Sequence, residues 1–198
     1  MEQMRQVMKQ MIEVSEDELS RFLSQTVVKT FKRQEILSRP NAIPNEVFFI
    51  NKGLIRVLIT DHEGTEHTIH FALENQFIAD YSNFIQKQPS IYSLQALEET
   101  QVVVLPRTAI EWGYQNLTDG QKMGRLIAEF YFIYQDDRIK NMYVRTPKQR
   151  YDTTPDCFLF GHYANSLEQA QKSGNRKTIN ICYRLTKPSL STFVLQFN

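Results

Sequence analysis

Apolar side chains in the first 23 residues recur every three or four positions, the spacing of one face of a helix. A first helix is expected where this stripe contains Met4, Val7, Met8, Met11 and Ile12. Ser15 followed by Glu18 is a capping-box pattern and predicts that a second helix begins there. Because stripes of Met and Leu usually face a core, both helices are expected to cover the unit that follows.

Between Val27 and Pro106 the pattern changes to short runs rich in Val, Ile, Phe and Thr, separated by turn residues. Such runs at close spacing predict antiparallel strands in a sandwich or barrel. Two hairpins are expected. One joins VFFI to LIRVLIT through the turn at 51–53, and the other joins LIRVLIT to TEHTIHFA through the turn at 61–64.

The segment from Asp119 to Arg145 contains no proline and carries an apolar residue every three or four positions. This pattern predicts a long helix that ends before Pro147. Its apolar seam is expected to lie along its own barrel, along a second copy, or both. The residues expected in this dimer seam are Met123, Leu126, Ile127, Phe130, Ile133 and Tyr134.

Charge divides the chain into two parts. Residues 1–144 hold 15 basic and 19 acidic side chains, whereas residues 145–198 hold 8 and 3. The basic C-terminal part indicates either a polyanionic partner or a solvated basic face. A length of 198 residues with 41% hydrophobic residues allows one large domain or two small ones.

Composition also limits location and chemistry. The chain has no apolar run of about 18 residues, and its polar start does not resemble a signal peptide, so a cytoplasmic protein without a membrane span is expected. Cys157 and Cys182 are too few for a disulfide framework or an iron–sulfur site. His67 and His70 would point to opposite faces of a strand and could not share a metal ion. Without a phosphate loop or an activated nucleophile, no enzyme, metal or cofactor is expected.

One segment points to a family. Phe77 to Ser93, FIADYSNFIQKQPSIYS, resembles the cassette that holds the nucleotide in the Crp/Fnr (catabolite activator-like) transcription regulators. The sequence from KRQEIL to FIADY, residues 32–81, resembles the jelly roll of the same family. The resemblance implies an α+β protein: a cyclic-nucleotide-binding-like β jelly-roll barrel with N-terminal helices (1–118), a long dimerisation helix (119–145), and a divergent winged helix-turn-helix-like DNA-binding region (146–198).

The cassette departs from the family where it would hold a phosphate. Ser90 stands at the position resembling the phosphate-binding arginine, and Ile91 at the neighbouring hydroxyl position. Because a buried phosphate needs a fixed cation, the effector is unknown and is not expected to be cAMP. The segment is either a binding site for a neutral or weakly charged ligand or a polar loop over a filled barrel. The candidate effector-pocket residues are Asp80, Tyr81, Ser82, Ser90, Ile91, Tyr92 and Ser93.

The C-terminal part resembles the family more weakly. Residues 145–152 are similar to the linker before the winged helix-turn-helix, and residues 179–193 can be aligned with that motif, with Arg184 at its turn glycine and Pro188 early in the recognition helix. The candidate DNA contacts are Lys148, Arg150, Lys172, Arg176, Lys177, Arg184 and Lys187 for phosphates, with Ser189 and Ser191 facing the bases.

The resemblance implies a homodimeric transcription regulator that binds double-stranded DNA. The alternative is a dimeric sensor or interaction module that has lost DNA binding.

Overall fold

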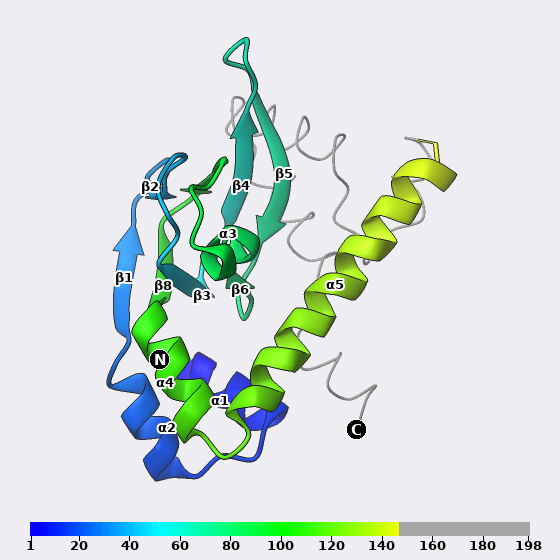
Figure 1. Ribbon diagram of the computed structural model, residues 1–198. Helices are drawn as coiled ribbons and strands as arrows, with labels where there is room; N and C mark the ends of the chain where they lie inside the picture. The colour runs from blue at the N-terminus through cyan, green and yellow to red at the C-terminus, as the bar shows by residue number, and fades with distance from the viewer. Residues whose placement is uncertain (147–198) are drawn as a thin grey trace.

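Two four-stranded antiparallel sheets make up the centre of the molecule (Figure 1). The computed structural model describes residues 1–146, apart from the side chain of Arg138. In one sheet the strands lie in the order β1 (Val27–Phe31), β8 (Thr100–Pro106), β3 (Glu46–Lys52) and β6 (Phe77–Ile78). In the other sheet the order is β2 (Ile36–Ser38), β7 (Tyr92–Ala96), β4 (Ile55–Thr60) and β5 (Glu66–Ala72).

Strand β3 is buried on both faces because its sequence is a continuous apolar run. Successive side chains of a strand point to opposite faces. Phe48 and Ile50 pack in the core that includes β4 and β7, whereas Val47 and Phe49 pack in a second core with the N-terminal helices. The first sheet therefore separates two hydrophobic cores.

The two expected hairpins have different outcomes. β4 and β5 pair directly, and the turn between them is closed by Asp61 Oδ1, which accepts hydrogen bonds from the backbone of Glu63 and Thr65, each 2.9 Å long. The prediction of a β3–β4 hairpin is wrong, because these two strands belong to different sheets. Gly53 has a φ of +109°, and a Cβ there would lie 2.5 Å from Thr100 Oγ1. This glycine lets the chain turn from one sheet to the other.

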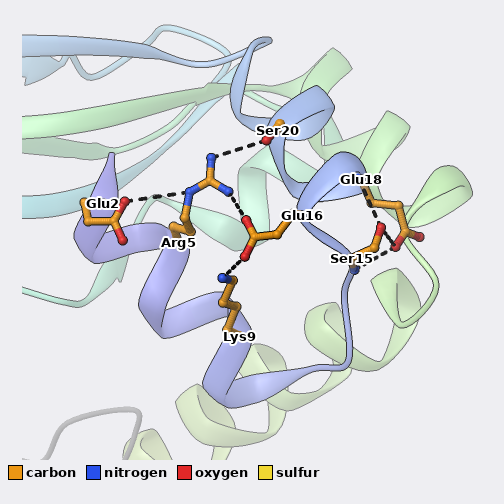
Figure 2. Close-up of polar contacts among 7 residues, drawn as sticks. All are labelled: Glu2, Arg5, Lys9, Ser15, Glu16, Glu18 and Ser20. Carbon is orange, nitrogen blue, oxygen red and sulfur yellow. Dashed lines mark hydrogen bonds and ion pairs between the residues drawn. The ribbon is translucent and has the colours of Figure 1, made fainter.

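The N-terminal helices α1 (Glu2–Met11) and α2 (Glu16–Leu23) confirm the sequence prediction. Their apolar faces are buried in the second core, and the capping box of Ser15 and Glu18 is present. Figure 2 shows that Glu16 on α2 accepts hydrogen bonds from Arg5, at 2.7 Å, and from Lys9 on α1. Because the Glu16 carboxylate is largely exposed, these ion pairs orient the two helices more than they stabilise them.

Helix α4 (Arg107–Asn116) follows β8, and α5 (Gly120–Val144) leaves the short turn after it and runs obliquely past the sheets (Figure 1). The sequence pattern predicted this last helix at 119–145, and each of these bounds lies one residue from the end that the structure shows. A Cβ on Gly120 would lie 2.1 Å from the carbonyl oxygen of Gly113, so only glycine allows α5 to start this close to α4. In the part of the chain that the structure describes, no helix is both long and apolar enough to cross a membrane.

Glu18 connects the capping box to the turn between α4 and α5. Its Oε2 accepts from the backbone and hydroxyl of Ser15, while its Oε1 accepts from the backbone and hydroxyl of Thr118 at 2.9 and 2.7 Å. These hydrogen bonds, above all that from the Ser15 hydroxyl, lower the pKa of Glu18 from 4.5 to about 2. The start of α5 is thereby tied to the N-terminal helices.

The low pKa of Glu18 makes a prediction about acid stability. A carboxylate whose pKa is lower in the folded state contributes stability above its unfolded pKa, and this is lost as the pH falls toward the folded value. The loss of melting temperature in Glu18→Gln should therefore be largest near neutral pH and should shrink as the pH falls through the window from 4.5 toward 2. Glu13→Gln is the matched control, because the hydrogen bond that Glu13 donates to Asp119 Oδ2 comes from its backbone. A Glu18→Gln loss that stays constant with pH would contradict the assignment.

Candidate functional site

A cavity of about 470 Å³ lies between the jelly roll and α5. Its wall is formed by residues of strands β3 to β8, of α2, of the start of the helix α3 (Tyr81–Gln86), and of one side each of α4 and α5. Its size falls within the usual range for small-molecule sites. The cavity exists because α5 leaves the turn after α4 obliquely and meets the sheets along only part of its length.

Helix α3 is the element that sequence analysis missed. Asp80 caps it: Oδ1 accepts from the backbone of Asn83 at 3.3 Å, and Oδ2 accepts from the side-chain amide of Asn83 at 2.7 Å. An aspartate before a short run of helix-compatible residues was the available signal. The segment therefore contains a helix, and that helix begins at the wall of the cavity.

Phenol groups supply most of the polar atoms in the cavity wall. The hydroxyls of Tyr81 and Tyr114 lie 3.3 Å apart, and the buried hydroxyl of Tyr131 on α5 donates to the backbone carbonyl of Phe77 on β6. Burial raises the pKa of Tyr114 and of Tyr131 well above the usual range of a phenol, and the Tyr81 hydrogen bond raises that of Tyr114 further. These hydroxyls therefore keep their protons and act as donors.

Histidine and tyrosine also meet where β5 faces α5. The rings of His70 and Tyr134 pack edge to face at 5.5 Å, with Tyr134 Oη 3.5 Å from His70 Nδ1. His67, three residues earlier, instead pairs with Asp61 at 2.7 Å outside the cavity. The two histidines thus have different partners, and the pairing of β5 with β4 is irregular between Thr68 and His70. The described residues hold no group of three or more potential ligands that could bind a metal ion.

Lysine and arginine are absent from the cavity wall within residues 1–146; Asp80 is the one acidic residue and His70 the one histidine that line it. The nearby arginine Arg107 has other partners. Its guanidinium lies 3.9 Å above the ring of Phe84 and donates to the carbonyls of Phe84 and Pro44 at 2.6 and 2.9 Å. Arg107 thus holds α3 against the loop before β3. Arg56 pairs with Glu66 at 2.5 Å.

The sequence and the fold were both compared with those of known proteins. Residues 28–116 match the family described as "Cyclic nucleotide-binding domain". The matched part of the chain is similar to this domain. It contains every strand that the structure describes except the first residue of β1, and all of α3 and α4. No curated protein gave a significant sequence match.

Solved structures show the same fold. A cyclic nucleotide-binding domain from Methylobacillus flagellatus has a TM-score of 0.58 at 19% identity, covering 72% of this chain and 81% of that one. The catabolite activator protein of Thermus thermophilus has a TM-score of 0.56 at 14% identity, covering 95% and 85%. The c-di-GMP-responsive regulator CLP of Xanthomonas campestris has a TM-score of 0.55 at 11% identity, covering 69% and 68%. The domain therefore has structural neighbours among Crp/Fnr regulators.

The fold brings together some of the predicted effector residues. Four of the seven line the cavity: Asp80, Tyr81, Ser82 and Tyr92. Three do not. Ser90 is buried and its hydroxyl accepts from the backbone of Tyr92 at 2.9 Å, whereas Ile91 is 63% exposed and Ser93 is buried on β7. Sequence reasoning missed the cavity-lining residues His70, Tyr114 and Tyr131, which belong to elements distant from the cassette.

The predicted dimer seam lies mostly inside the single chain. Met123 is buried in the core beneath the N-terminal helices, and Leu126, Ile127 and Phe130 pack against the same core. Tyr134 contacts His70, and Ile133 is partly exposed. The structure describes one chain, so the dimer stays a prediction. The candidate DNA contacts, from Lys148 to Ser191, lie outside the described residues.

The bond from Tyr131 to Phe77 predicts how firmly α5 is held to the domain. Tyr131→Phe would leave a buried carbonyl without this donor and should destabilise the fold by about 1–3 kcal/mol in chemical denaturation. Tyr143→Phe is the matched control, because Tyr143 is 86% exposed on the same helix and should change stability by less than about 0.5 kcal/mol. Equal effects of the two changes would mean that the Tyr131 hydroxyl does not hold α5.

Proposed function

We propose that the protein is a DNA-binding transcription regulator of the Crp/Fnr type whose effector domain does not use a cyclic-nucleotide phosphate. The arrangement of α5 carries the proposal. This helix closes a cavity in a domain similar to cyclic nucleotide-binding domains and leads directly into the basic segment 145–198. The proposed division of the chain is an effector domain (1–118), a dimerisation helix (119–145) and a DNA-binding region (146–198).

The chemistry of the cavity argues against cAMP and cGMP. Ser90, at the position resembling the family's arginine, uses its hydroxyl within its own turn, and no cation replaces it along the described wall. Loss of a buried charge-assisted partner typically costs about 2–5 kcal/mol. That corresponds to a loss of affinity of about 30-fold to several thousand-fold. The effector is therefore proposed to be another molecule.

The exposed side of α5 supports a homodimer. Ile139 and Tyr143 are 54% and 86% exposed and do not line the cavity, and their spacing of four residues places them on one face of the helix. A second copy would cover this face with the same residues, as in a two-fold symmetric interface. The two basic segments would then lie on the same side of the dimer and could reach successive major grooves.

The cavity and the proposed dimer face share one helix, which provides a route for regulation. A molecule that binds between the domain and α5 would favour one position of that helix over others. Because α5 continues into the proposed DNA-binding region, its position would set the spacing of the two heads. Ligand and DNA would then affect each other's binding by the same factor.

The proposal predicts that DNA affinity resides after Arg145 and falls steeply with salt. The full chain should shift genomic fragments from upstream of its own gene, and log affinity should fall by about 0.9 per phosphate contact for each unit of log salt. A chain that ends at Val144 should keep the fold and lose DNA binding. If it binds as well as the full chain, or if the full chain binds no DNA at low salt, the dimeric sensor or interaction module replaces the regulator.

A further inference from the structure

We propose that the cavity between the jelly roll and α5 binds an uncharged, largely apolar molecule that carries a hydrogen-bond acceptor such as a carbonyl oxygen. This inference rests on the proposed role of the domain as a sensor and names the chemistry of its ligand. It depends on three properties of the cavity, which are its charge, its walls and its donor pair.

The charge of the wall disfavours an anion. Within the described residues, no lysine or arginine lines the cavity, and Arg107 is held by Phe84 and Pro44. Asp80 is the acidic residue at the wall, and its two oxygens already accept from Asn83. An anion would lose its hydration without gaining a cation, whereas an uncharged molecule avoids that cost.

The walls favour an apolar and partly flat ligand. Aromatic rings come from opposite sides, with Phe77 and Tyr92 on the strands and Tyr131 on α5. Ile69 on β5 and Ile127 on α5 add aliphatic side chains to the same wall. Such walls stabilise a ligand mainly by removing its apolar surface from water and by ring stacking, neither of which needs a charge on the ligand.

The pair of Tyr81 and Tyr114 specifies the acceptor. Their hydroxyl oxygens are 3.3 Å apart, so one phenol donates its proton to the other. Whichever phenol accepts this hydrogen bond still has its own O–H, because a phenol is both a donor and an acceptor. That proton can be donated to a ligand oxygen. A ligand with a carbonyl group would therefore gain a hydrogen bond that a pure hydrocarbon could not make.

The test uses two uncharged naphthalene dyes with the full-length protein. One is 6-propionyl-2-(dimethylamino)naphthalene, which carries a ketone, and the other is N-phenyl-1-naphthylamine, which does not. Both dyes should bind and show enhanced emission, and the ketone dye should bind more tightly. cAMP should not displace either dye at millimolar concentration.

Variants identify the donor pair and the cavity. The double change Tyr81→Phe and Tyr114→Phe should lower the affinity for the ketone dye by about 2- to 10-fold, which corresponds to one neutral hydrogen bond. The affinity for the other dye should not change. Ala128→Trp, at the exposed rim of the cavity, should lower the affinity for both dyes. Glu129→Trp is the matched control, because Glu129 is the next residue, is also exposed and does not line the cavity. This change should leave both affinities as they are.

Several results would overturn the inference. These are the absence of dye binding, displacement by micromolar cAMP, an equal effect of the tyrosine changes on both dyes, or an equal effect of the two tryptophan changes. DNA binding measured on the same preparations separates this inference from the proposed function. If the protein binds DNA but not the dyes, the proposed ligand class is wrong. If it binds the dyes as described but does not bind DNA, only the proposal of a DNA-binding regulator is wrong.

Discussion

The packing of α5 against the jelly roll is the contact on which the rest of the site depends. At its start, Gly120 allows a close approach to α4, and Glu18 ties the preceding turn to the N-terminal helices. In its middle, the Tyr131 hydroxyl donates a hydrogen bond to the backbone carbonyl of Phe77 on β6, the first residue of the cassette. The cavity is the space left between these fixed points, so its shape depends on the position of α5.

Charge determines what this space can hold. The chain keeps an aspartate at the start of α3 but uses it as a helix cap, and it uses Arg107 to hold α3 in place. Arg107 is thereby not available to balance a phosphate in the cavity, and the Asp80 carboxylate would repel one. Phenols with raised pKa values supply donors instead, which suits an uncharged ligand.

Local patterns predicted most of the elements. The capping box at Ser15, the turn at 61–64 and the helix near 119–145 all follow from interactions between residues close in sequence, and the structure confirms them. The false β3–β4 hairpin shows the limit, since the role of Gly53 depends on Thr100 from a distant strand. The same limit explains why Tyr114 and Tyr131 were missed, because only the tertiary fold brings them to the cassette.

The central claim is that α5 has two adjacent apolar faces, one closing the cavity of its own chain and the other meeting a second copy. Sedimentation of the full chain tests this most directly. We expect twice the chain mass for the natural protein and a folded monomer for Ile139→Glu, while Ile85→Glu, the same change of an exposed isoleucine on α3, should remain a dimer. A natural protein that sediments as a monomer, or an Ile139→Glu protein that stays dimeric, would contradict the account.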